Sequence, residues 1–196
     1  ELFKIHYHPN LPSSLRNFIN DALQSVWNVS NLYKPILPVM IDALAQTGTR
    51  EVLDLCSGGG GPWFGLVRDF DIEEHCPIYV RLTDKYPNRE AFETAFTNSR
   101  STVNFDTRSV DAAEVPIDLK GFRTMFSSFH HFRGSDAHRV LSNAVESNRG
   151  IAIFEMARRD AKTMLAVCFI PFLILFLTPR IRPFRYSRLL WTYVIP

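Results

Sequence analysis

The segment over residues 51–63 constrains the fold of this chain more than any other part of the sequence. It begins with an apolar run, 52–55, whose one charged residue is Asp54, and continues into four consecutive glycines, 58–61. Such a run is typical of a strand buried on both faces of a parallel sheet. Glycines let the backbone turn sharply and approach a ligand closely, because they carry no Cβ. Pro62 suits the first turn of a helix, so the segment predicts a strand, a loop that binds a nucleoside cofactor, and a helix.

Strand and helix patterns alternate from this segment to about residue 156. The later predicted strands cover residues 77–83, 102–108, 122–127 and 151–156, and the predicted helices cover residues 15–27, 35–46, 88–97 and 135–147. This alternation is typical of an α/β fold with a doubly wound, mostly parallel sheet of the Rossmann-like type. We expect one such domain over residues 1–156, followed by a C-terminal segment, 157–196, that packs on the domain or forms a lid.

Composition excludes several classes of protein. The 22 basic and 20 acidic side chains nearly balance, so the net charge of +2 gives no reason to expect nucleic acid as a partner. The three cysteines, at positions 56, 76 and 168, form no CxxC pair, and His130 and His131 lack the spacing of zinc ligands. We therefore expect neither a disulfide framework nor a metal site, and a cytoplasmic location fits best.

Polar residues end the predicted strands where an open parallel sheet binds its ligands, at the carboxyl ends of the strands. Asp54 and the glycine loop end the first strand. Asp84 ends the second, 24 residues after Gly60, at a spacing where a carboxylate accepts hydrogen bonds from both ribose hydroxyls. Asp111 follows the third, where it could accept from an exocyclic amine such as that of adenine, with Val110 or Ala112 against the base. The alternative for Asp111 is a solvated loop acid.

The fourth predicted strand ends in hydroxyl and imidazole side chains over residues 127–132. His130 and His131 could act as a base or orient a substrate, since imidazole titrates near neutral pH. Adjacent histidines at such a turn also serve packing and hydrogen bonding, and this alternative stays open. Glu155, at the end of the fifth strand, is a further candidate carboxylate, whose alternative role is a helix cap or a salt bridge to a nearby arginine.

The glycine loop narrows the choice of cofactor. A nicotinamide or flavin site needs a G-x-G-x-x-G pattern, whose third glycine lets a helix and a strand pack closely beside a pyrophosphate. Counted from Gly58 or Gly59, that position holds Trp63 or Phe64, and the Gly-Lys-Ser/Thr of a P-loop is also missing. A dinucleotide oxidoreductase is therefore disfavoured, and a ligand with an adenosine but no pyrophosphate remains.

These residues together resemble the class I S-adenosylmethionine-dependent methyltransferases. The first motif of that family, an apolar strand, an acid and a G-x-G loop, is similar to residues 52–60, with Cys56 where a glycine is more usual. The resemblance covers residues 35–156 and includes the acid after the second strand, the Asp-Ala pair after the third and the polar end of the fourth. It implies methyl transfer from S-adenosylmethionine to a small-molecule acceptor, with S-adenosylhomocysteine as product.

The resemblance also implies roles for individual residues. Asp54 would organise the loop and the amino-acid end of the cofactor, and His130 or His131 would be the base. The implied cofactor-binding residues are Asp54, Cys56, Gly58, Gly60, Asp84, Asp111, Ala112 and Ser127. Because the sulfonium is already activated, the protein mainly has to hold acceptor, methyl carbon and sulfur in line, exclude water and, where necessary, remove a proton.

The C-terminal part departs from the family. The family's sheet has seven strands, of which the last two form an antiparallel hairpin, whereas five strands are legible in this sequence. A bare sheet edge is an aggregation liability. We therefore expect either that the natural protein continues past Pro196 or that a five-stranded variant is covered by a C-terminal helix.

Residues 163–179 form an uncharged apolar run, interrupted by Pro171 and followed by four arginines within residues 180–188. The run is shorter than the roughly 20 apolar residues of a membrane span and has a proline near its middle, so a true span is disfavoured. Three interpretations stay open: a core helix, a lid over an apolar or lipid-like substrate, or a peripheral membrane contact through residues 163–191. The arginines could bind an acidic substrate or form a solvated basic face.

The leading hypothesis for function is a methyltransferase that acts on an oxygen, nitrogen or carbon atom of a small molecule. Residues 127–132 lack the Asn/Asp-Pro-Pro-Tyr/Phe/Trp signature with which resembling enzymes act on amino groups of bases or amides. Methylation of DNA or of glutamine is therefore disfavoured. The alternative is a non-catalytic module that binds the cofactor or a partner, because a fold alone does not establish activity.

Overall fold

The computed structural model describes residues 33–74, 77–99 and 102–155, together with a few residues between positions 169 and 186. Contacts within the chain divide it into two units, Asn31–Met156 and a second made of Glu1–Ser30 with Ala157–Pro196. The first unit holds the sheet and is described by itself below. The predicted helix over residues 15–27 lies outside the described residues, and the predicted domain division at residue 156 stays a prediction.

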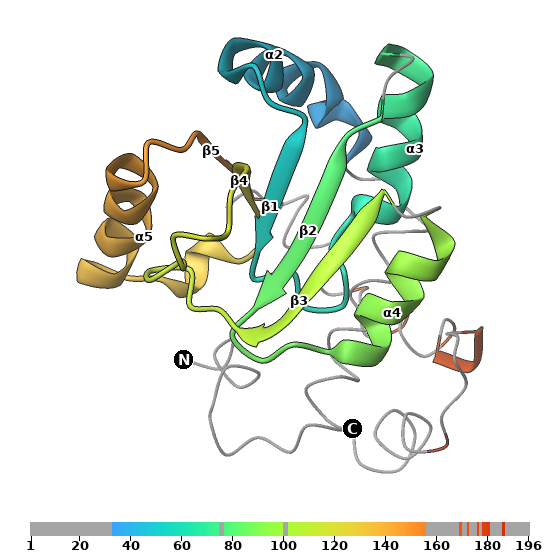
Figure 1. The fold of residues 1–196 in the computed structure, drawn as a ribbon. Helices are drawn as coiled ribbons and strands as arrows, with labels where there is room; N and C mark the ends of the chain where they lie inside the picture. The colour runs from blue at the N-terminus through green and yellow to red at the C-terminus, as the bar shows by residue number, and fades with distance from the viewer. Residues whose placement is uncertain are drawn as a thin grey trace. The chain divides into compact units, whose positions relative to one another are not determined.

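Five parallel strands form one sheet in the order β3-β2-β1-β4-β5 (Figure 1). The strands are β1 (Glu51–Leu55), β2 (Tyr79–Asp84), β3 (Val103–Ser109), β4 (Phe122–Phe126) and β5 (Ile151–Phe154). In the central strand, Glu51 lies opposite Tyr79 of β2 and Val52 lies opposite Phe122 of β4. The strand order reverses between β1 and β4. In a sheet of this kind, ligands bind at that point, beyond the carboxyl ends of the two strands. The predicted α/β fold with a doubly wound sheet is confirmed.

The helices also follow the predicted order. They are η2 (Lys34–Ile36), α2 (Leu37–Thr47), α3 (Trp63–Glu74), α4 (Arg89–Asn98), η3 (Phe129–His131) and α5 (Ser135–Glu146). The helix predicted over residues 35–46 begins instead as the 3-10 turn η2, in which the Leu37 N–H donates to the Lys34 carbonyl. Pro38 has no N–H for the next α-helical bond to that carbonyl, which favours the tighter turn. The helix ends at Gly48 in the left-handed conformation, with φ of 63°.

The two directions of winding place helices on both faces of the sheet. Right-handed crossovers take the chain from β1 through α3 to β2 and through α4 to β3, and in the opposite direction from β4 through α5 to β5. In Figure 1, α3 and α4 accordingly lie beside the β2 and β3 half and α5 beside the β4 and β5 half. The core under α5 is apolar and contains Leu53, Leu55, Val110, Ala112, Ala113, Val115, Leu119, Met125 and Val140.

The opposite face of β1 and β4 is aromatic. The indole of Trp63, at the start of α3, meets the ring of Phe126 edge-on at a centroid distance of 5.5 Å. Tyr33, just before η2, meets the same ring edge-on at 4.9 Å. Buried aromatic pairs of this geometry add to the stability gained from apolar burial. The start of α3 and the segment before α2 are therefore fixed against the end of β4.

Gly121 is where the chain comes closest to the central strand before it enters β4. Its φ is +122°, and a Cβ there would lie 3.0 Å from the carbonyl oxygen of Glu51 and 3.1 Å from the backbone nitrogen of Leu53. Both neighbours are backbone atoms of β1 and cannot move aside without disturbing the sheet. A side chain at position 121 is therefore excluded by conformation and by space.

We predict that Gly121→Ala lowers the free energy of unfolding much more than Gly48→Ala. Gly48 also has a positive φ, +63°, but nothing lies within 4 Å of the place that a Cβ would occupy, so alanine there meets no clash. We expect a loss of about 1 kcal/mol at Gly48 and of about 3 kcal/mol or more at Gly121. Denaturant unfolding followed by circular dichroism measures both, and equal losses would contradict the close approach at Gly121.

The predicted C-terminal run falls largely outside the described residues. Of residues 163–191, the structure describes three exposed phenylalanines, Phe169, Phe172 and Phe176, the 3-10 turn η4 (Thr178–Arg180) and Tyr186. Among the described helices, none combines the length and the apolar character that a bilayer crossing requires. The choice between core helix, lid and membrane contact stays a prediction.

Candidate functional site

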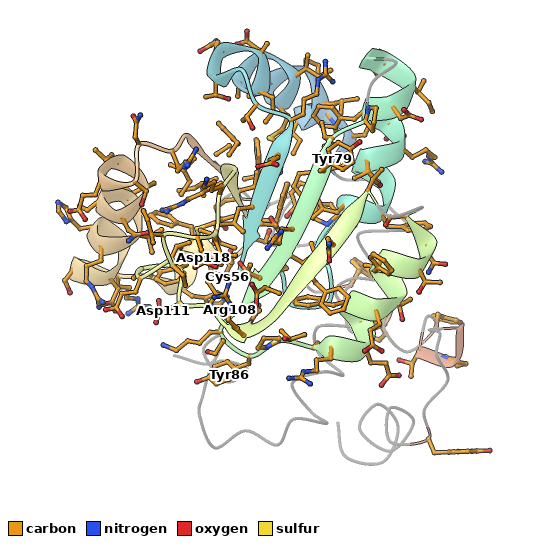
Figure 2. All side chains as sticks on the ribbon, viewed as in Figure 1. Cys56, Tyr79, Tyr86, Arg108, Asp111 and Asp118 are labelled. Carbon is orange, nitrogen blue, oxygen red and sulfur yellow. The ribbon has the colours of Figure 1, made fainter. Side chains whose placement is uncertain are left out.

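The predicted site residues gather at the carboxyl ends of the strands. Figure 2 shows Cys56, Tyr86 and Asp111 at this edge of the sheet, whereas Tyr79, the first residue of β2, lies toward the opposite end. The loops after β1, β2 and β3 therefore meet at one edge, as the parallel sheet requires.

Asp54 forms the buried base of the site. Its Oδ2 accepts a hydrogen bond from Ser57 Oγ at 2.6 Å and its Oδ1 accepts one from Thr124 Oγ1 at 2.7 Å. Thr83 Oγ1 donates to the main-chain oxygen of Asp54 at 2.8 Å, and the Thr83 N–H donates to Ser57 Oγ at 3.2 Å. These bonds join β1, β2, β4 and the first turn of the glycine loop. Asp54 thus holds the loop from below.

Burial raises the pKa of the Asp54 carboxyl to about 7, outweighing the opposite effect of its hydrogen bonds from Ser57 and Thr124. The nearby charge of Asp84 raises it further. The Trp63 indole N–H faces the carboxyl closely enough to favour its charged form, but within the described residues it makes no hydrogen bond of normal geometry. The Asp54 carboxyl therefore titrates near neutral pH.

The loop after β1 turns through left-handed backbone conformations. Cys56 has φ of +59° and Gly60 has φ of +110°. The value at Cys56 explains why a glycine is more usual at this position, because such angles cost energy for residues with a Cβ. The Cys56 side chain packs against the core under α5. Burial and the carboxylates of Asp84 and Asp54 raise the pKa of its thiol, which is therefore neutral rather than a nucleophilic thiolate.

Asp84 ties the loop after β1 to the loop after β2. Its side chain is buried, with Oδ2 accepting from the Gly58 N–H and Oδ1 accepting from the Tyr86 N–H, each at 2.8 Å. Two backbone donors therefore fix the plane of the carboxylate. Each carboxylate oxygen can accept a second hydrogen bond, so the arrangement is compatible with the predicted contact to two ribose hydroxyls.

Asp111 lies at the outer rim of the same edge. Its Oδ2 accepts from Lys85 Nζ at 2.7 Å and its Oδ1 accepts from the Ala113 N–H at 2.9 Å. Burial raises the pKa of Asp111, but the bonds from Lys85 and Ala113 outweigh it and leave the pKa below its usual value. Asp111 is therefore an ordered carboxylate that is still partly exposed, and the choice between a cofactor contact and a solvated loop acid stays a prediction. Ala112 beside it is buried in the core under α5.

Ser127 lies where β4 ends and has an unusual backbone, with φ of +43°. Its Oγ shares a 2.7 Å hydrogen bond with the hydroxyl of Tyr33. Burial raises the pKa of Tyr33 to about 12, despite the lowering effect of the Ser127 hydrogen bond, so the phenol stays protonated at neutral pH. The Ser127 hydroxyl, which is predicted to contact the cofactor, is thus bonded to a tyrosine from the segment before α2.

One of the two predicted bases, His130, is bonded to an acid. His130 Nδ1 lies 2.8 Å from Glu155 Oε2, and the His130 backbone N–H donates to Glu155 Oε1 at 3.2 Å. The rings of His130 and His131 lie next to each other, with a centroid distance of 4.0 Å. A carboxylate that accepts from Nδ1–H fixes the ring and leaves Nε2 to accept a proton. The structure therefore brings together His130 and Glu155 as a candidate base and its orienting acid.

Sequence patterns do not identify four residues of this edge: Ser57, Thr83, Thr124 and Tyr33. For Thr83 and Thr124 a signal is present, because each is a polar residue in a predicted buried strand and such residues need hydrogen-bond partners. No sequence pattern connects Tyr33 with Ser127, which lies 94 residues further along the chain. Glu155 is only a candidate on the sequence, and its bonds to His130 give it a definite place.

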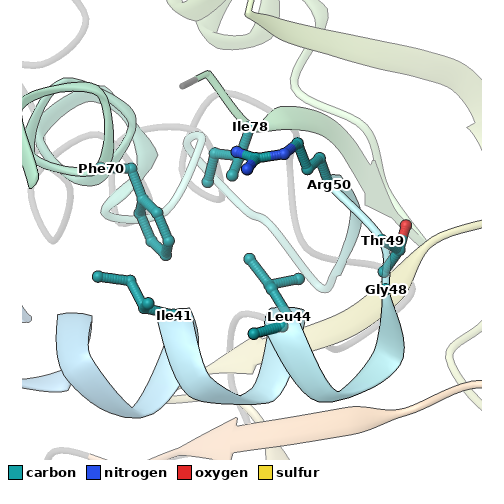
Figure 3. A pocket seen from close by; sticks show the side chains of 8 residues that line it. Ile41, Leu44, Gly48, Thr49, Arg50, Phe70 and Ile78 are labelled. Carbon is teal, nitrogen blue, oxygen red and sulfur yellow. The ribbon is translucent and has the colours of Figure 1, made fainter. Parts of the chain in front are cut away.

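Within the part of the chain that the structure describes, two surface pockets lie away from this edge, at the amino ends of the strands. One, of about 230 Å³, has an apolar wall from α2 and α3 and the Arg50 side chain at its rim (Figure 3). The other, of about 490 Å³, lies between the ends of α2 and α5 and includes Gly121 and Arg149. Neither contains a predicted site residue. Ligands of open parallel sheets bind at the carboxyl edge, so we place the candidate site there.

Comparison with known proteins supports the fold alone. No protein-family model matches the chain, and neither does any curated protein. Among solved structures, the chain is similar to an O-methyltransferase family protein from Burkholderia thailandensis, with a TM-score of 0.51 and 18% sequence identity. The match covers 81% of this chain and 50% of the other, so the chain spans about half the length of that protein. The chain therefore shares the α/β fold of that protein.

We predict that stability depends on the protonation of Asp54. The folded state holds this proton more tightly than the unfolded state, because the pKa is about 7 instead of 3.8. The stability that this group contributes is therefore present below about pH 4 and is lost as the pH rises through about 7. In Asp54→Asn, which cannot ionise, the decline of the unfolding free energy between pH 4 and pH 8 should be smaller by up to about 4 kcal/mol.

Urea unfolding at a series of pH values measures this difference. Asp42→Asn, at an exposed position on α2, is the matched control and should keep the pH profile of the parent protein. Parallel profiles for Asp54→Asn and the parent protein would show that the Asp54 carboxyl does not titrate in this range.

Proposed function

We propose that this chain binds S-adenosylmethionine at the carboxyl edge of its sheet and transfers the methyl group to a small-molecule acceptor. The observation that carries the proposal is the buried Asp84 carboxylate, which is bonded to the Gly58 N–H of the glycine loop beside the point where strand order reverses. A carboxylate held at that point suits the two hydroxyls of a ribose. Asp111, fixed at the rim, suits the amine of the adenine.

The packing of Trp63 supports a cofactor without a pyrophosphate. In a dinucleotide site a third glycine at this place lets the helix approach the strand closely. Here the Trp63 side chain is fully buried and its indole meets the ring of Phe126. The space that a pyrophosphate-binding turn needs between strand and helix is therefore filled by an aromatic side chain.

Charge at this edge also favours the proposed cofactor. The sulfonium of S-adenosylmethionine is a cation, and the site residues Asp84, Asp111 and Glu155 are acids. Lys85 pairs with Asp111, the outermost of these acids, and so lies at the rim of the site. Carboxylates near a buried cationic centre stabilise its binding.

The His130 and Glu155 pair supports an acceptor that must lose a proton. With Glu155 on Nδ1, the imidazole can take a proton on Nε2 as the acceptor attacks the methyl carbon. A hydroxyl group is such an acceptor, and the similar solved structure is described as an O-methyltransferase family protein. We therefore favour an oxygen acceptor. The contact of residues 163–191 with a membrane remains a separate proposal that this function does not require.

We predict that S-adenosylhomocysteine binds the chain and that Asp84→Asn weakens binding about tenfold or more, because the variant loses a charged acceptor for the ribose. Isothermal titration calorimetry measures the affinities. Asp118→Asn is the matched control, since Asp118 lies at the same edge but is exposed and bonded to Arg108. Absence of binding by the parent protein, or equal affinities in Asp84→Asn and the parent, would overturn the assignment of the cofactor.

We predict that His130→Gln and Glu155→Gln lower methyl transfer without changing affinity for S-adenosylhomocysteine. Loss of a general base typically costs about 100-fold or more in rate. The assay measures S-adenosylhomocysteine released from S-adenosylmethionine with a panel of phenols, alcohols and fatty acids as acceptors. His138→Gln, on the exposed side of α5, is the control and should keep full activity.

The same panel separates the two functional hypotheses. Turnover with any acceptor that falls in both variants supports a His130 base. Turnover that is unchanged in both variants removes the pair from the mechanism. If the cofactor binds but no acceptor is methylated, the alternative is favoured, a non-catalytic module on the methyltransferase fold.

A further inference from the structure

We propose that Lys85 is a positioning residue for the cofactor's adenine, which it serves by holding Asp111 in the conformation that accepts from the 6-amino group. This inference rests on the proposed function, because it assigns a role within the same cofactor site. It adds a residue that the family resemblance does not include and that has no sequence motif of its own.

Lys85 lies between the two acids of the proposed site and is bonded to the loop that carries the second. Its main-chain oxygen accepts from Ser109 Oγ at 2.7 Å, and its Nζ donates to Asp111 Oδ2 at 2.7 Å. One residue earlier, the main-chain oxygen of Asp84 accepts from the Val110 N–H at 2.9 Å. The ribose acid and the adenine acid thus belong to one hydrogen-bonded unit, with Lys85 at its centre.

The bond to Lys85 fixes the carboxylate plane of Asp111. The Ala113 N–H holds Oδ1 and Lys85 Nζ holds Oδ2, so both oxygens are held and the side chain has little freedom to rotate. A carboxylate oxygen can accept two hydrogen bonds, so each can also accept one from a ligand amine. Because the carboxylate is ionised, a hydrogen bond from that amine is charge-assisted and stronger than one to a neutral acceptor.

The exposure of the pair argues against a role in stability. The side chains of Lys85 and Asp111 are 51% and 36% exposed, and ion pairs this exposed add little to the free energy of unfolding. The neighbouring arginine, Arg139, pairs with Glu114 and Asp136, and its charge also lowers the pKa of Asp111. Within the described residues, Lys85 is therefore the cation that is bonded directly to Asp111.

The test compares two ligands by isothermal titration calorimetry on the full chain. One is S-adenosylhomocysteine, and the other is its purine analogue, in which hydrogen replaces the 6-amino group. In Lys85→Met we expect S-adenosylhomocysteine to bind about tenfold more weakly and the analogue to change by less than about twofold, because the analogue has no amine for Asp111. Lys85→Arg should restore most of the preference, and Lys120→Met, at an exposed position, should leave both affinities unchanged.

Two results would overturn the inference while leaving the proposed function intact. Equal weakening of both ligands would mean that Lys85 only maintains the loops, and unchanged affinity for both would mean that the ion pair has no part in binding. Absence of binding by the parent protein would overturn the proposed function and this inference together. Thermal unfolding of each variant serves as the folding check. If Lys85→Met does not fold, Asp111→Asn must show the same selective loss of affinity for S-adenosylhomocysteine.

Discussion

The rest of the site depends on the hydrogen bonds that the buried carboxyl of Asp54 accepts. One oxygen accepts from Ser57 at the start of the glycine loop and the other from Thr124 in β4, so a single group fixes the loop to the two strands between which the strand order reverses. Burial of this carboxyl is costly, because its ionised form loses its hydration in the interior of the protein. The result is a loop whose backbone is held in left-handed conformations close to where a ligand is expected.

The amino and carboxyl ends of the strands differ in the contacts that they make. At the amino ends, Gly121 approaches the backbone of β1 closely, just before β4 pairs with that strand. At the carboxyl ends, Asp84 and Asp111 each accept hydrogen bonds from two donors, and Lys85 connects their loops. Carboxylates that are fixed before a ligand arrives lose little entropy on binding. The geometry at this edge is therefore compatible with the adenosine ligand that we propose.

The periodic parts of the structure could be predicted from the sequence, and the long-range side-chain pairs could not. The five strands, the glycine loop and the places of Asp84 and Asp111 follow from alternation of elements and from residues at strand ends. The bond between Asp54 and Thr124 joins residues 70 positions apart and exists because β4 pairs with β1, which depends on strand order. Tyr33 and Ser127 meet because the segment before α2 packs against the end of β4. Local patterns carry no information about strand order, whereas tertiary packing determines it.

Hydrogen–deuterium exchange with and without S-adenosylhomocysteine tests the central claim most directly, because it reports where on the chain a ligand binds. We expect slower exchange in peptides that contain residues 56–61, 84–86 and 110–113, with no change around residues 47–50, which line the two pockets at the amino ends of the strands. Unchanged exchange throughout, or protection confined to residues 47–50, would contradict the placement of a cofactor site at the carboxyl ends of the strands.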